Sequence, residues 1–322
     1  MITRRKVLMA AGAAWLAAPH ISLAQGKPLR LIGVLMPLDN PNYPVFLEGL
    51  RAAGYEDGKN IRIMMRSAKS DYARLPALAR ELVDAKVELI VAINTPGVRA
   101  AIDATKTIPV IMTQVGDPVG TGFVSNLGRP GGNVTGLSSM IGELGPKRLS
   151  ILHELVPAAK RIAVLYNPAD PVNDPQIRDI GQAAPKLGVE VRYYAVKTPA
   201  DLPETFAALR AWRAGAAIWL GGQPQAYQAS SIKLAAQSKL PLMVGSRGDT
   251  EAGGLISYAA DPAATLRHTA TYVDKILKGT PAGQIPVEQP TRFDFVVNLK
   301  TAKALGLKVP QAILIQATRV IE

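Results

Sequence analysis

Apolar runs of strand length alternate with amphipathic helices along most of this chain, and this alternation constrains the fold more than any other feature. The predicted helix 71–85 shows the pattern clearly, because its apolar residues recur every three or four positions. Strands separated by helices predict parallel sheets with right-handed crossovers. The expected strands are 30–36, 60–66, 89–93 and 109–115 in the first half, and 161–166, 189–196, 216–220 and 241–245 in the second.

Four strand–helix units occur twice, which predicts an α/β protein of two doubly wound parallel-sheet lobes. After Gly245 the alternation breaks, and a short strand at 255–258 leads into a long helix at 261–277. A chain that crosses back between lobes needs such extra elements, so we expect three crossover segments. They are placed near 136–142, 254–258 and 285–291, with a first lobe of 28–140 plus 258–284 and a second lobe of 141–257 plus 285–322.

The first 24 residues have the order of an export signal. A positive stretch, Arg4–Lys6, precedes a short apolar run, Val7–Ala18, and Ser22-Leu23-Ala24 places small residues before a cleavage site. The apolar run is shorter than the ~20 residues of a membrane span, although a short uncleaved anchor is the alternative. We expect residues 1–24 to be a signal peptide of the twin-arginine or general secretory type, and the mature chain to be soluble and periplasmic.

The amino-acid composition argues against several kinds of binding site and catalytic site. The formal charge is +12, but Lys and Arg are scattered and aromatic residues are few, so we expect no nucleic-acid partner. The chain has no cysteine, which excludes disulfides and thiolate metal sites. Beyond the signal, only His153 and His268 remain, without metal-ligand spacing. No P-loop, dinucleotide fingerprint or nucleophile elbow is present. We therefore expect no catalytic residue, no metal and no cofactor.

Candidate ligand-binding residues lie where the predicted strands end, because open parallel sheets bind small molecules outside the carboxyl ends of their strands. Any one of these residues is more often a turn or cap residue than a ligand contact, but polar loops recur at the same end of both sheets. The candidates are Met36, Asp39, Thr95, Gly97, Gln114 and Asp117 in the first lobe, and Asn167, Gln223, Ser246, Asp249 and Tyr258 in or beside the second.

Several stretches resemble the substrate-binding proteins of ABC transporters, in the uncharacterised or aromatic-amino-acid-type branch of the type 1 periplasmic binding proteins. The resemblance runs from about residue 31 to the C-terminus. It is carried by 32–37 (IGVLMP), 116–120 (GDPVG), 129–136 (RPGGNVTG), 147–149 (KRL), 163–168 (AVLYNP), 251–255 (EAGGL), 270–279 (ATYVDKILKG) and 298–307 (NLKTAKALGL).

The resemblance implies two Rossmann-like lobes that close on a small molecule, here an aromatic or other amino acid, and deliver it to an ABC permease in the inner membrane. It also implies a monomer. By analogy with amino-acid binding, Thr95 and Gly97 hold the ligand carboxylate, and Gln114 or Asp117 meets the amine. Asn167 and Asp249 then close from the second lobe. Two alternatives stay open at this point: an exported α/β enzyme, and a clamp that reports to a receptor instead of a permease.

Overall fold

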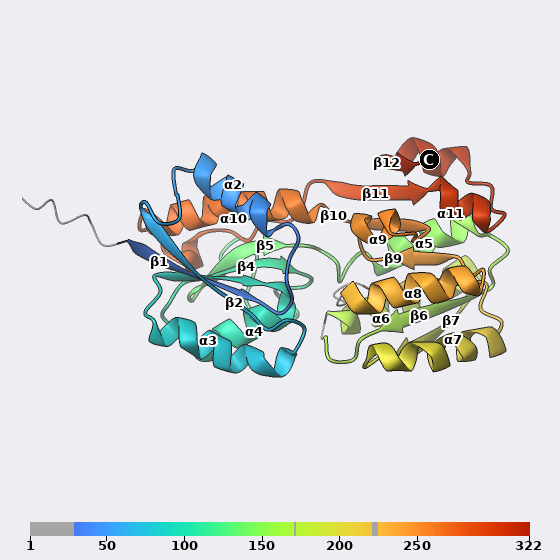
Figure 1. Ribbon diagram of the computed structural model, residues 1–322, viewed down its shortest axis with the longest axis horizontal. Coiled ribbons are helices and arrows are strands. Elements are labelled where there is room, and N and C mark those ends of the chain that lie inside the picture. Colours follow the sequence, from blue (N-terminus) through green and yellow to red (C-terminus); the bar gives the residue numbers. More distant parts are fainter. Residues whose placement is uncertain (1–28, 171, 221–224) are drawn as a thin grey trace, which may run out of the picture.

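Two lobes, each built on its own sheet, make up the protein, as shown by a computed structural model that describes residues 29–170, 172–220 and 225–322 (Figure 1). The expected signal peptide, 1–24, and the candidate Gln223 lie outside these residues. Both lobes are α/β, and the sheets are mostly parallel. The expected fold class is therefore confirmed.

The first sheet is fully parallel, with the order β2-β1-β3-β4-β5. Its elements in chain order are β1 (Arg30–Met36), α2 (Tyr43–Ala52), β2 (Ile61–Ser67), α3 (Leu75–Asp84), β3 (Leu89–Ile93), α4 (Asn94–Ala104), β4 (Val110–Val115) and β5 (Val134–Ser138).

The second sheet has the order β12-β11-β10-β9-β8-β6-β7, and only β10 and β11 pair in the antiparallel sense. This exception to the expected parallel sheet arises because the chain returns from the first lobe along β11, against the direction of β10. The elements that follow β5 in the chain are α5 (Gly145–Leu155), β6 (Arg161–Tyr166), α6 (Asn173–Ala183), β7 (Glu190–Ala195), α7 (Leu202–Ala211), β8 (Ala216–Trp219), α8 (Gln225–Gln237), β9 (Leu242–Val244), α9 (Arg247–Glu251), β10 (Ile256–Ala260), α10 (Pro262–Leu277), β11 (Phe293–Asn298), α11 (Leu299–Ala304), α12 (Gln311–Gln316) and β12 (Arg319–Ile321). All of them except α10 belong to the second lobe.

Helices cover both faces of each sheet, which explains why the central strands read as continuous apolar runs. In the first lobe, α2 and α10 lie on one side of the sheet and α3 and α4 on the other (Figure 1). In β1, Ile32 and Val34 pack with the apolar side chains of α2 and α10, while Leu35 packs with those of α3 and α4. In the second sheet, α5, α6, α11 and α12 cover one face and α7 and α8 the other. Each lobe therefore has two apolar layers, one on either side of its sheet.

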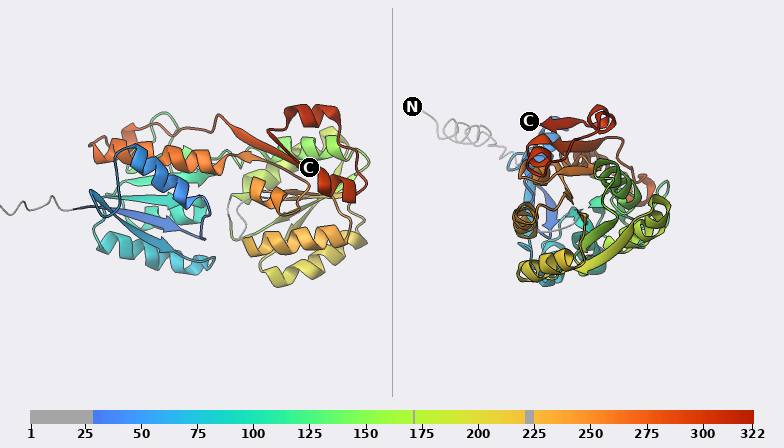
Figure 2. Two further views of the ribbon diagram at one scale, coloured as in Figure 1. Left: turned by 45° about the horizontal axis from the view of Figure 1, so that its top comes forward. Right: turned by 90° about the vertical axis from the view of Figure 1, so that its right-hand side faces the viewer.

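Helix α10 belongs to the first lobe although it follows most of the second lobe in sequence, and the views in Figure 2 show it lying along α2. Its Leu266 and Tyr272 are fully buried against the first sheet. Tyr55 of the α2–β2 connection donates from its hydroxyl to Asp274 Oδ1 at 2.9 Å. The chain thus passes between the lobes three times.

The crossover boundaries differ from the expected ones by a few residues. Residues 258–260, expected in the first lobe, pair with 293–295 in the second sheet. Ile285 and Val287, expected in the second lobe, are buried in the first, and Leu137 forms a bridge with Glu288. The lobe limits we adopt are therefore 29–138 plus 262–288, and 145–260 plus 293–322.

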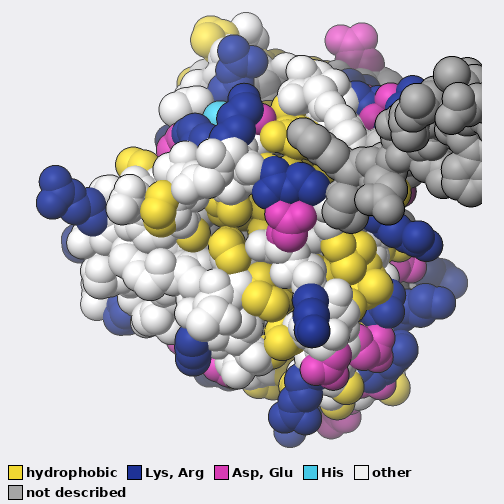
Figure 3. Space-filling view, turned by 90° about the vertical axis from the view of Figure 1, so that its left-hand side faces the viewer, with side chains coloured by type: hydrophobic (Ala, Val, Ile, Leu, Met, Phe, Trp, Pro, Cys, Tyr) yellow, Lys and Arg dark blue, Asp and Glu magenta, His cyan; other side chains and the backbone are white. Residues whose placement is uncertain are grey.

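Neither the charge distribution on the first-lobe end nor the length of the described helices distinguishes one region of the protein. On the end of the first lobe, basic and acidic side chains are interspersed and do not gather into one patch (Figure 3). No helix within the described ranges is long and apolar enough to cross a membrane.

Candidate functional site

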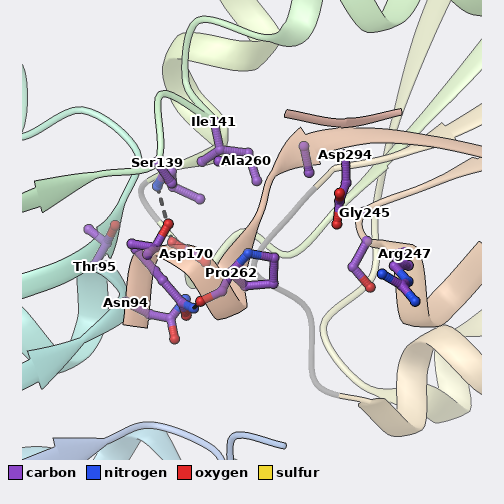
Figure 4. A pocket seen from close by; sticks show the side chains of 15 residues that line it. Asn94, Thr95, Ser139, Ile141, Asp170, Gly245, Arg247, Ala260, Pro262 and Asp294 are labelled. Atoms are coloured by element: carbon purple, nitrogen blue, oxygen red, sulfur yellow. Dashed lines mark hydrogen bonds between the residues drawn. The ribbon is translucent and has the colours of Figure 1, made fainter. Parts of the chain in front are cut away.

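A cavity of about 170 Å³ lies between the lobes, at the ends of strands from both sheets. This volume is below the ~300–1,000 Å³ of typical ligand pockets, so the cavity has room only for a compact ligand. Residues from each lobe and from the first crossover segment line it (Figure 4). They include Asn94, Thr95, Gln114 and Pro262 of the first lobe, Asp170, Ser246, Arg247, Ala260 and Asp294 of the second, and Ser139 and Ile141 of the first crossover segment.

The first-lobe wall is built where β3 and β4 end. Asn94 and Gln114 have φ of 59° and 60°, in the left-handed region that non-glycine residues rarely adopt and that is concentrated at functional sites. Thr95, 3% exposed, lies in the first turn of α4, whose N-terminal end carries a partial positive charge. The Gln114 amide lies between Asn40 Nδ2, at 3.4 Å, and the Pro262 carbonyl oxygen, at 3.5 Å. This wall can receive an anionic group.

Asp170 is the buried carboxyl group of the cavity. It lies in the loop after β6, is 3% exposed, and accepts a hydrogen bond from the Val172 N–H at Oδ1, at 3.1 Å. The Asn167 carbonyl oxygen shapes the loop, because it accepts from the Asp170 N–H at 3.1 Å and from Asn173 Nδ2 at 2.8 Å. Burial raises the pKa of Asp170 to about 7, with a smaller rise from nearby Asp174 and an opposing effect of the Val172 N–H. A buried carboxyl group of this kind favours a cationic partner.

Ser246 is presented to the cavity by a buried framework. Its Oγ donates to Asp249 Oδ2 at 2.6 Å and accepts from the Asp249 N–H at 3.3 Å. Burial raises the pKa of Asp249, and the bonds to Ser246 and the charge of Arg148 oppose that rise. Arg148 of α5 is 1% exposed, and its Nη2 donates to the carbonyl oxygens of Trp219 and Val244, both at 2.9 Å. The arginine therefore holds together the ends of β8 and β9, from which the Ser246 turn starts.

Arg247 and Asp294 are charged residues on the second-lobe side, set apart from Asn94 and Thr95 in Figure 4. Arg247 Nε donates to Glu251 Oε1 at 2.9 Å. Burial raises the pKa of Asp294, and the like charge of Asp261 adds to the rise. On the crossover side, Ser139 Oγ is buried without a hydrogen-bond partner among the described residues. A polar group of a ligand could supply that partner.

The structure brings together three of the sequence-predicted residues in the cavity lining: Thr95, Gln114 and Ser246. Asp249 supports Ser246, and Asn167 supports the Asp170 loop, so both lie one contact behind the lining. The remaining described candidates lie elsewhere. Met36 is in the first-lobe core, Asp39 is exposed and accepts from Ser67 at 2.7 Å, Gly97 packs near Pro37, Asp117 accepts from the Gly120 N–H at 2.7 Å, and Tyr258 stacks on Phe293 with ring centroids 5.4 Å apart.

The candidates from sequence do not include Asn94, Asp170 and Asp294, which line the cavity. Asn94 and Asp170 do follow predicted strands, β3 and β6, so the strand-end rule reaches both positions. Asp294 has no such signal. It lies at the beginning of β11, which reaches the cavity with its N-terminal end because it runs antiparallel to β10.

Two doubly wound lobes, joined by three crossover segments and sharing one lined cavity, define a two-lobed binding protein. A family model for ABC transporter substrate binding proteins matches residues 37–321. The chain belongs to this family, whose members bind solutes, and it is not an enzyme.

Individual members of this family are similar to the chain over most of its length. The "Tyrosine-binding protein" of Clostridioides difficile (strain R20291) is 30% identical over 290 residues, which are 88% of this chain and 82% of that protein. The structure of a Streptococcus pneumonia ABC domain in complex with L-Trp is similar with a TM-score of 0.83 at 26% identity, covering 91% of this chain and 100% of that one. A ligand-free, open substrate binding protein with adhesive properties from Clostridium difficile gives 0.67 at 27% identity, covering 91% and 99%.

Proposed function

We propose that this protein captures an α-amino acid in the inter-lobe cavity by hinge closure and passes it to an ABC permease in the inner membrane. It acts outside the cytoplasm, as a monomer. The observation that carries the proposal is the placement of buried Asp170 in a cavity that the start of α4 also lines. One side supplies a negative charge and the other a positive helix end, as a zwitterion requires.

The ligand groups can be assigned to opposite walls. The ammonium pairs with the Asp170 carboxylate, and the ligand carboxylate lies against Thr95 at the N-terminal end of α4. Ser139 Oγ, buried without a partner among the described residues, is free to bond either group. The ligand side chain packs among Ile141, Val172 and Ala260. The named ligands of two relatives, tyrosine and L-Trp, support an aromatic or another amino acid as the ligand.

Hinge closure is supported by the resemblance to relatives in two states. The chain is more similar to the L-Trp complex, with a TM-score of 0.83, than to the ligand-free open structure, with 0.67, although identity and coverage are nearly equal. A ligand contacted from both lobes stabilises only the closed arrangement, so its binding draws the lobes together.

The proposal predicts that at least one of the twenty standard L-amino acids raises the melting temperature of the purified protein and lowers its radius of gyration. A micromolar ligand corresponds to about 8 kcal/mol of binding free energy. Thermal-shift assays find the ligand, and small-angle scattering measures the compaction. If none of the twenty changes either quantity, the amino-acid proposal is wrong.

Binding should also depend on pH. Because the pKa of Asp170 in the ligand-free protein is about 7, lowering the pH below this value protonates the carboxyl group before an ammonium can pair with it. The ligand keeps its own ammonium throughout this range. We expect affinity to fall up to about tenfold per pH unit below that value. Calorimetric titrations across the interval test this, and a flat profile contradicts the pairing with Asp170.

A further inference from the structure

Gly116 lies where the two lobes touch, beside the cavity. It follows β4 of the first lobe directly and is two residues after Gln114, which lines the cavity. A Cβ atom at Gly116 would lie 2.1 Å from Cγ2 of Val172 and 2.8 Å from Cγ2 of Ile141. Both separations are far inside the ~3.5–4.0 Å of favourable carbon contact. Val172 directly precedes α6 of the second lobe, so even one methyl group at Gly116 collides with the opposite lobe.

The glycine is not required by the local backbone. Its φ lies outside the left-handed region, so an L side chain is compatible with its conformation. Gly136 provides the contrast within the same lobe, since its φ is 137° and a Cβ there would lie 1.9 Å from the Met112 carbonyl oxygen. Gly136 is required by the first lobe itself, whereas Gly116 is required by the approach of the second lobe.

We propose that Gly116 is a positioning residue that receives the Val172 side chain in the closed clamp, and that any side chain there holds the cleft open. The inference rests on the proposed closure. In this proposal, the contact between Gly116 and Val172, beside the ligand, sets how far the lobes can close. Ile141, in the first crossover segment, also packs against Gly116, because its Cγ2 would lie 2.8 Å from a Cβ atom there.

The test compares Gly116→Ala, Val172→Ala and the double variant with the wild type. The probe is the L-amino acid that raises the wild-type melting temperature most. Gly116→Ala should weaken its affinity about 10- to 100-fold, as expected for overpacking a close contact, and should abolish the compaction. Val172→Ala removes the nearer of the two atoms that a Cβ at Gly116 would meet and leaves the Ile141 contact in place. In the Gly116→Ala background it should therefore restore the compaction and part of the affinity, by about tenfold.

Gly128→Ala is the matched control, because Gly128 is exposed in the same lobe, has no left-handed φ, and a Cβ there would come only within 3.7 Å of Asn126 Oδ1. It should bind like the wild type. The inference is overturned if Gly116→Ala binds and compacts normally, if Val172→Ala gives no recovery, or if Gly116→Ala lowers the melting temperature of the ligand-free protein. A wild type that neither binds nor compacts would instead count against the proposed function itself.

Discussion

Asp170→Asn should weaken amino-acid binding by roughly 30-fold to several thousand-fold, while making the ligand-free protein more stable at neutral pH. The loss follows from removing one partner of a buried, hydrogen-bonded charge pair, which costs about 2–5 kcal/mol. The variant keeps the side-chain shape, so the bond from the Val172 N–H can form to the amide oxygen. Only the charge that faces the ammonium is lost.

The gain in stability follows from the pKa of the same carboxyl group. Folding raises it from 3.8 to about 7 because the group is buried. A carboxyl group with a raised pKa contributes most to stability below its unfolded pKa, and this contribution is lost as the pH rises through the folded value. At neutral pH the wild type therefore carries a penalty of at most about 4 kcal/mol, which Asn does not share.

Urea denaturation of wild type and Asp170→Asn at about pH 5 and about pH 8 measures this effect, and the stability advantage of the variant should be larger at the higher pH. Asp174→Asn is the control, because Asp174 is an exposed carboxyl group in the first turn of the adjacent helix α6. It should bind nearly as the wild type does. Undiminished affinity in Asp170→Asn would show that Asp170 does not hold the ligand.

Arg148→Ala should lower the free energy of unfolding by about 3–5 kcal/mol. It removes a large buried side chain and leaves the Trp219 and Val244 carbonyl oxygens without their donor. Burial lowers the pKa of Arg148 to about 10, so the guanidinium stays charged at neutral pH and continues to oppose the raised pKa of Asp249. Ligand affinity should fall as well, since the Ser246 turn starts from these strand ends.

Lys147→Ala is the matched control, because Lys147 is the exposed neighbour of Arg148 on the same helix. Arg148→Met separates the two contributions. It fills most of the volume but donates no hydrogen bond, so its cost should fall between those of the control and of Arg148→Ala. Thermal and urea denaturation measure all three variants. An Arg148→Ala protein as stable as the control would show that the two bonds contribute nothing net.

The two-lobed α/β fold is predictable from sequence because the central strands are buried on both faces and therefore appear as unbroken apolar runs. The strand β5 (Val134–Ser138) was not predicted from the sequence. It begins within a Gly-rich stretch, and Gly136 in its centre is needed for the close approach to Met112. The tail elements α12 and β12 were also unexpected, because a six-residue helix and a three-residue strand are too short to show a period.

Only part of the candidate site was predictable, for a related reason. Strand ends identify loops, but they do not say which loop residue turns inward. In the loop after β6, Asn167 is used for backbone bonds and Asp170 reaches the cavity. Tyr258 of β10 packs on Phe293 and Phe295, while its neighbours Ala259 and Ala260 line the cavity. The direction of each side chain depends on partners far away in the sequence.

The late position of α10 has a consequence for biosynthesis. One apolar layer of the first lobe joins residues such as Ile32 to Leu266 and Tyr272, so a nascent chain cannot bury that layer until the ribosome has made more than four-fifths of the protein. The sheet of the second lobe is likewise incomplete until β11 and β12 have been synthesised, because these two strands form one of its edges. Neither half can mature during early translation, and chains that stop before α10 should expose an apolar sheet face and aggregate.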